Sequence, residues 1–71
     1  MKSLFDRLAD ANAREVDKRF PDRLTNDGWA TGNDWFCTKV YSKGDKPTMI
    51  LCTYMDKGKI RHRVEKYWRH F

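Results

Sequence analysis

The chain has 71 residues, of which 39% are hydrophobic and 35% are charged, and its formal net charge is +5. These proportions are typical of one small globular domain with at most two layers of secondary structure. No apolar run approaches the roughly 20 residues that span a bilayer, and residues 1–7 lack the apolar segment of a signal peptide. We therefore expect a cytoplasmic protein that forms a single domain over residues 1–71.

The positive charge is concentrated in the second half of the chain. Residues 1–36 contain six Lys and Arg and seven Asp and Glu, a net charge of −1, whereas residues 37–71 contain nine and three, a net charge of +6. Residues 57–71 alone carry six of these cations and a single acid, Glu65. Such a density of cations attracts a polyanion or an acidic protein surface, although Lys and Arg on a small domain also keep it soluble.

Residues 3–20 are expected to form an amphipathic helix. Ser3 can cap its N-terminus, Asp6 lies near the positive end of the helix dipole, and Pro21 ends the helix. Apolar residues recur at steps of three and four and form one stripe: Phe5, Leu8, Ala9, Ala13, Val16 and Phe20. This stripe requires an apolar sheet face to cover it.

Three strand-like segments follow, each with alternating character: Asp34–Ser42, Thr48–Met55 and Lys59–Val64. Turns that contain Gly44 and Gly58 separate them, and β-branched and aromatic residues flank both turns, which predicts two successive hairpins. The predicted fold is therefore α+β, with the N-terminal amphipathic helix packed on a three-stranded antiparallel β-meander.

The segments on either side of this meander are harder to assign. Residues 21–33 are rich in turn residues and are expected to form a linking loop, in which Trp29 either covers the edge of the core or is an exposed contact residue. At the C-terminus, apolar residues fall at helical spacing: Val64, Tyr67, Trp68 and Phe71. Residues 65–71 can therefore continue the strand or form a short C-terminal helix that covers part of the sheet.

Two-residue Lys-Gly turns determine the expected register of the meander. Under this register Val40 opposes Pro47, and Met55 opposes Ile60. A longer turn with a bulge after Met55 would instead pair Ile60 with Tyr54. We prefer the first register because it joins the apolar side chains of all three strands on one face.

The two cysteines are expected to be reduced and partly buried. Under the preferred register Cys37 opposes Ile50 and lies diagonal to Cys52, a relation less suited to a disulfide than a direct cross-strand pair. The cysteines and histidines also lack the close pairs that structural zinc sites use. We expect neither a metal nor a cofactor.

Enzyme motifs are absent from the sequence. It contains no phosphate-binding glycine motif, no zinc-protease His-Glu pair, and no Ser or Cys in a nucleophile motif. His62 and His70 could act as general bases, as histidines do in metal-independent ribonucleases, but neither has an obvious orienting carboxylate. We therefore expect a protein that is not an enzyme.

The order of helix, Gly-Trp loop and meander is similar to the first four elements of double-stranded-RNA-binding domains and of the small mRNA-cleaving toxins built on that fold. The RNA-binding domains continue into a long C-terminal helix, whereas this sequence is expected to have room for only a short stub of it. The toxins carry a Gly-Ser-His run in the first hairpin, where this sequence has Phe36-Cys37-Thr38-Lys39. The similarity concerns architecture, which does not establish a function.

The expected binding site is the sheet face opposite the apolar one, together with the basic C-terminal segment. Aromatic rings stack on unpaired bases, and neighbouring cations neutralise phosphates. The candidate residues are Trp35, Lys39, Tyr41, Tyr54, Lys57, Lys59, Arg61, Arg63, Lys66 and Arg69. We predict a non-enzymatic module that binds single-stranded or RNA-like nucleic acid. The alternative is a small regulator or inhibitor, of the kind a virus or mobile element makes, that binds an acidic surface of a host complex handling nucleic acid.

Overall fold

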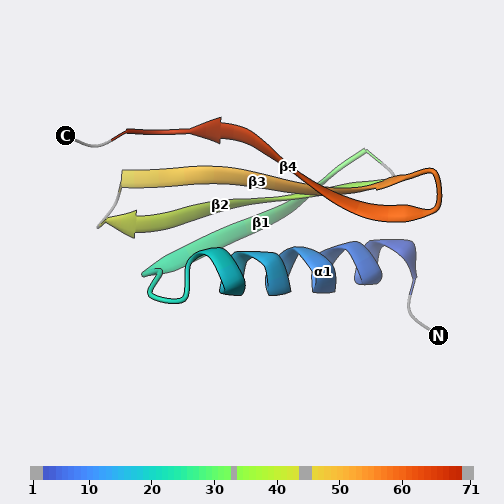
Figure 1. The fold of residues 1–71 in the computed structure, drawn as a ribbon, viewed down its shortest axis with the longest axis horizontal. Helices are drawn as coiled ribbons and strands as arrows, with labels where there is room; N and C mark the ends of the chain where they lie inside the picture. The colour runs from blue at the N-terminus through green and yellow to red at the C-terminus, as the bar shows by residue number, and fades with distance from the viewer. Residues whose placement is uncertain (1–2, 33, 44–45, 70–71) are drawn as a thin grey trace.

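The protein folds into two layers, with one helix packed on a four-stranded antiparallel sheet (Figure 1). The computed structural model describes residues 3–32, 34–43 and 46–69. Its elements in chain order are α1 (Leu4–Arg19), β1 (Thr25–Thr31), β2 (Trp35–Lys43), β3 (Lys46–Asp56) and β4 (Lys59–Tyr67). The predicted α+β class is confirmed, with one strand more than expected. No helix in the described part of the chain has the length and apolar character needed to cross a membrane.

Local sequence signals determine α1, as predicted. The Ser3 hydroxyl accepts a hydrogen bond from the backbone N–H of Asp6 at 3.2 Å, which caps the N-terminus. The side of α1 that faces the sheet is narrower than the predicted apolar stripe and includes a polar residue. Its buried side chains are Leu8, Asn12 and Val16.

The core lies between α1 and the two middle strands. Four aliphatic and thioether side chains form one buried cluster, with Phe20 packed beside it: Val16, Val40, Met49 and Leu51. Burying such a side chain contributes roughly 1.5 to 3 kcal/mol, so this cluster dominates the apolar stabilisation. The preferred register places Val64 of β4 on the same apolar face as these side chains, but Val64 is 39% exposed, because α1 packs mainly on β2 and β3.

The sheet has a fourth strand, β1, where the sequence predicts a loop. This strand pairs antiparallel with β2 along its whole length. Its Asn-Asp-Gly run is a turn signal, but Gly28 lies under the Phe36 ring so closely that a Cβ there would be 2.8 Å from Phe36 Cζ. Glycine inside a strand often marks such a close approach. Every residue of β1 is exposed, so the strand forms an open edge of the sheet.

The register of β2 against β3 differs from the prediction by two residues. Val40 opposes Met49 rather than Pro47. Irregular pairing on both sides of Tyr41 accounts for the shift, because it takes up residues near the turn that a regular ladder would pair. A shift of two residues keeps every side chain on its predicted face. Gly44, in the predicted turn, lies outside the described residues.

The corrected register places Cys37 directly opposite Cys52, and the two form a disulfide. Their Cα atoms are 4.0 Å apart, the close spacing of a non-hydrogen-bonded antiparallel pair. The prediction of reduced thiols is therefore wrong, because it depended on a diagonal placement. Disulfides persist mainly in oxidising compartments, so this bond weighs against the cytoplasmic location, which stays a prediction.

The hairpin between β3 and β4 has the predicted two-residue turn. Lys57 and Gly58 have φ angles of 51° and 78°, and positive φ at both central positions is the requirement of the type I′ turn, one of the two common two-residue hairpin turns. Met55 pairs with Ile60, as expected. The alternative register, with Ile60 opposite Tyr54, is therefore not formed.

Further along β4 a bulge changes the register by one residue. Val64 pairs with β3 as predicted, but Lys66 rather than Glu65 occupies the next position of the ladder. Pairing then continues, and the Trp68 N–H donates to the Thr48 carbonyl at 2.9 Å. The C-terminal helix is therefore not formed over residues 65–69, whereas residues 70–71 lie outside the described part.

Candidate functional site

The helix covers one face of the sheet, and no described element covers the other (Figure 1). Contacts with α1 identify the covered face: the Phe36 ring packs edge-to-face on Phe5 at 5.5 Å, and Thr38 is hydrogen-bonded to Asn12. Strand side chains alternate between faces. The uncovered side, which we call the open face, therefore presents Trp35, Cys37, Lys39 and Tyr41 of β2, Ile50, Cys52 and Tyr54 of β3, and Arg61 and Arg63 of β4.

A cavity of about 390 Å³ lies on this open face. All four strands contribute to its lining: Trp29, Thr31, Trp35, Cys37, Ile50, Cys52, Arg63 and Glu65. The two cysteines are buried, so the disulfide forms the floor, while the more exposed Trp29, Arg63 and Glu65 form the rim. The volume falls within the range of small-ligand sites.

Trp35, one wall of the cavity, is held by an aromatic stack. It opposes Tyr54 in the β2–β3 ladder, and the two rings are nearly parallel, with centroids 4.4 Å apart and an interplanar angle of 12°. Such a pair contributes roughly 0.5 to 1.5 kcal/mol beyond its buried area. The indole is thus fixed before any ligand arrives, which lowers the entropic cost of binding.

Trp68 follows β4 and forms a second aromatic group on the open face. Lys39 Nζ lies 5.7 Å and Lys66 Nζ lies 5.4 Å from the centroid of its ring, within the range of cation–π contacts. The bulge at Glu65 is what brings Lys66 to this side, because it places Lys66 opposite Ile50. An aromatic ring flanked by two ammonium groups therefore adjoins the cavity.

Two arginines of β4 add further positive charge. Arg61 Nε lies 3.2 Å from Asp56 Oδ2, and Arg63 Nε lies 3.5 Å from Glu65 Oε2. All four side chains are substantially exposed, and exposed ion pairs contribute only about 0 to 1 kcal/mol. Both guanidinium groups can therefore exchange these partners for a ligand at little cost.

The structure separates the other predicted residues from the cavity. Lys57 and Lys59 lie at the turn between β3 and β4, and Arg69 follows the end of β4. Tyr41 lies at the irregular end of the β2–β3 ladder. Of the ten predicted residues, only Trp35 and Arg63 line the cavity. Lys39, Tyr54, Arg61 and Lys66 lie on the same face without lining it.

Sequence reasoning also missed part of the lining. Trp29 and Thr31 were assigned to the loop, although their alternating placement is a weak strand signal that the Asn-Asp-Gly run outweighed. Glu65 was placed on the correct face by alternation but was not among the candidate residues. Ile50 was placed on the correct face but was not proposed as a contact.

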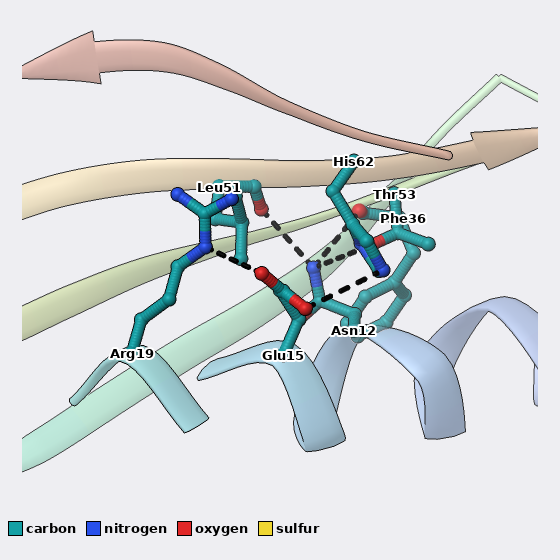
Figure 2. A network of polar contacts seen from close by, with 7 residues as sticks. All are labelled: Asn12, Glu15, Arg19, Phe36, Leu51, Thr53 and His62. Atoms are coloured by element: carbon teal, nitrogen blue, oxygen red, sulfur yellow. Dashed lines mark hydrogen bonds and ion pairs between the residues drawn. The ribbon is translucent and has the colours of Figure 1, made fainter. Parts of the chain in front are cut away.

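A polar network lies on the covered face, between α1 and the sheet (Figure 2). The Asn12 side chain is 1% exposed. Its amide donates to the Leu51 carbonyl at 3.1 Å and to the Thr53 hydroxyl at 3.0 Å, with a longer contact of 3.5 Å to the Phe36 carbonyl. Its Oδ1 accepts from the Thr38 hydroxyl. Because buried polar groups are costly unless paired, this network fixes the position of the helix on β2 and β3.

His62 links this network to the protein surface. Its Nδ1 lies 2.8 Å from the Thr53 hydroxyl, and its Nε2 lies 3.9 Å from Glu15 Oε1. Because Thr53 already accepts from Asn12, it can donate its own proton to Nδ1, which favours the neutral imidazole. Burial lowers the pKa of His62, and Glu15 opposes this in part. A hydrogen bond from Arg19 Nε, at 2.6 Å, lowers the pKa of Glu15.

This hydroxyl, imidazole and carboxylate follow the order of a nucleophile, a base and an orienting acid. The Thr53 side chain, however, has an exposed fraction of 0%, so a substrate cannot reach its hydroxyl. We therefore assign the trio a structural role. Among residues 3–32, 34–43 and 46–69, no group of three or more His, Cys, Asp or Glu is placed to hold a metal ion.

Comparison of the chain with known protein families, with curated proteins and with solved structures finds no match. The molecule is thus defined by its own features: a helix-backed antiparallel sheet whose open face carries aromatic rings, cations and a cavity over a disulfide.

Proposed function

We propose that the protein is a non-enzymatic module that binds single-stranded nucleic acid across the open face. The observation that carries this proposal is the cavity, in which the indoles of Trp29 and Trp35 and the guanidinium of Arg63 surround a space of about 390 Å³. Stacking of a base on an aromatic ring contributes roughly 1 to 3 kcal/mol. An unpaired base can enter such a space, whereas a paired base cannot leave its duplex without cost.

The distribution of charge supports the same proposal. α1 on the covered face carries four cations and four acids. β4 carries four cations and one acid, and Lys39 of β2 adds a further cation to the open face. Arg61 and Lys66 lie beside the cavity lining rather than in it, so they are placed to contact the phosphates of a strand whose base occupies the cavity. Phosphate contacts of this kind release counterions and make binding depend on salt.

The test is a titration of a fluorescently labelled nine-nucleotide oligothymidine, followed by anisotropy over a series of salt concentrations. We expect Arg61→Ala with Lys66→Ala to lower the slope of log affinity against log salt by about 1.4, since each phosphate contact on a single strand contributes about 0.7. The matched control removes one Arg and one Lys from exposed positions of α1, Arg14→Ala with Lys18→Ala, and should leave the slope unchanged.

Trp35→Ala measures the contribution of base stacking to affinity separately from that of charge. It should weaken binding of the single strand more than binding of a duplex of the same length, because only unpaired bases stack on the ring. Absence of binding at low salt, or an equal effect of the open-face and α1 double variants, would overturn the proposed function.

The alternative function, a regulator that binds a protein, is favoured by one different observation. β1 is an outer strand whose seven residues are all exposed, and such an edge can accept a strand from a partner. The two functions differ in a pull-down with the tagged protein from nuclease-treated and untreated lysate. Partners lost after nuclease treatment favour nucleic-acid binding, and partners retained favour the regulator.

A further inference from the structure

We infer that the cavity on the open face selects guanine over the other bases, and that Glu65 is the residue that specifies it. This inference rests on the proposed nucleic-acid function, because it names the base that the proposed site prefers. General affinity for nucleic acid does not explain an acidic residue, Glu65, at the rim of this cavity.

Among the residues that the structure describes, Glu65 is the only acid that lines the cavity, and it lies within the most basic part of the chain. A carboxylate on a face that binds phosphates repels them, so its presence at the rim works against unspecific binding. The side chain occupies the bulge of β4, between the ladder residues Val64 and Lys66. Bulges often re-aim a side chain beside a functional site. The Glu65 carboxylate therefore favours a ligand that presents hydrogen-bond donors to it.

The chemistry of the bases then decides which one fits. An ionised carboxylate is an acceptor only, and it binds most strongly when its two oxygens meet two parallel donors. Guanine has two adjacent donors, N1–H and the N2 amino group, on its Watson–Crick edge. Adenine and cytosine offer one amino group next to an acceptor, and thymine and uracil offer one N–H between two carbonyls. Guanine alone satisfies both oxygens of Glu65.

Arg63 completes the match. Its Nε lies 3.5 Å from Glu65 Oε2, and both side chains belong to the cavity rim. The guanine edge continues from its two donors to an acceptor, O6, and the guanidinium provides donors only. The Glu65 carboxylate can therefore accept from the two donors of guanine while the Arg63 guanidinium donates to its O6. Trp35, already ordered by its stack on Tyr54, supplies a surface for the plane of the base.

The test uses nine-nucleotide DNAs that are thymidine at every position except the fifth, which is G, A, C, T or inosine. A bidentate contact discriminates between bases by about 1 to 3 kcal/mol, so wild-type protein should bind the G oligonucleotide roughly 5- to 150-fold more tightly than the A, C or T oligonucleotides. Inosine lacks the N2 amino group and should lose most of this preference.

Glu65→Gln replaces one acceptor oxygen with a donor and should reduce the preference for G to within about twofold. Its affinity for oligothymidine should be kept or raised, because one negative charge is lost; this also shows that the variant is folded. Glu15→Gln, the same change on the covered face, should keep the preference for G.

The outcomes separate the two proposals. If wild-type protein binds no oligonucleotide, the proposed function fails and the guanine inference fails with it. If all five oligonucleotides bind equally, or if the preference for G persists in Glu65→Gln, the guanine inference is overturned while the proposed function stands.

Discussion

Removing the Asn12 side chain should destabilise this protein more than most single changes of its size. Asn12→Ala leaves the Leu51 carbonyl and the Thr38 hydroxyl without their buried side-chain partner, whereas the Thr53 hydroxyl keeps its bond to His62 Nδ1. Each buried group left unpaired costs about 1 to 3 kcal/mol, so two groups at the lower limit give a loss of about 2 kcal/mol. A domain of this length has a total stability of only about 4 to 11 kcal/mol. Even at this lower limit the variant should therefore lose roughly a fifth to a half of its stability.

The measurement is urea unfolding followed by circular dichroism, with wild type and variant compared at the same pH. The midpoint should fall while the dependence on urea stays the same, as expected when stability changes without a change in exposed surface. Asn26→Ala is the control, because Asn26 is exposed and its side-chain oxygen accepts an exposed hydrogen bond from Arg23 Nε at 2.9 Å. This variant should lose less than about 1 kcal/mol. A loss below about 1 kcal/mol for Asn12→Ala would refute the reasoning.

Three further predictions concern the sheet and its pairing with the helix. The intact mass of the purified protein should lie two hydrogens below that of the reduced chain, and titratable free thiols would contradict this. Cys37→Ser with Cys52→Ser should lower the free energy of unfolding by about 3 kcal/mol, because the disulfide closes a segment of 15 residues. Gly28→Ala should cost about 1 to 3 kcal/mol, because the Phe36 ring must move, and unchanged hydrogen exchange in β1 would count against it. The free energy of unfolding should decrease as the pH falls below 6.5, the ordinary pKa of histidine, because His62 then takes up a proton more readily in the unfolded chain than in the fold. His62→Asn should make stability less dependent on pH. An equal dependence in both proteins would disprove the role of His62.

The parts of the fold that follow from neighbouring residues could be predicted from the sequence. The capped helix α1 and the turn at Lys57 and Gly58 depend on local chemistry, and both were predicted correctly. β1 could not be predicted in this way, because its Asn-Asp-Gly run favours a turn unless the Phe36 ring lies over Gly28. That contact joins residues of different strands and exists only once the sheet has formed.

The candidate site, too, could be predicted only where it depends on local sequence. Alternation placed Trp35 and Tyr54 on one face without revealing that they are direct partners in the ladder. The same error of two residues hid the disulfide, since a register is decided by the whole hairpin rather than by any one residue. Alternation also placed Glu65 on this face, but it does not predict the bulge that takes Glu65 out of the ladder and brings Lys66 opposite Ile50.

The three tryptophans of the chain offer the sharpest test of where nucleic acid binds. Trp29 and Trp35 line the cavity, and Trp68 lies beneath two lysines of the open face. In a ¹H–¹⁵N NMR titration with the G-containing nine-nucleotide DNA, the indole N–H signals of Trp29 and Trp35 should move most, while the side-chain amide of Asn12 on the covered face should stay in place. Shifts confined to Asn12 and the amides of α1, or no shift of any tryptophan indole at saturating DNA, would contradict binding at the open face.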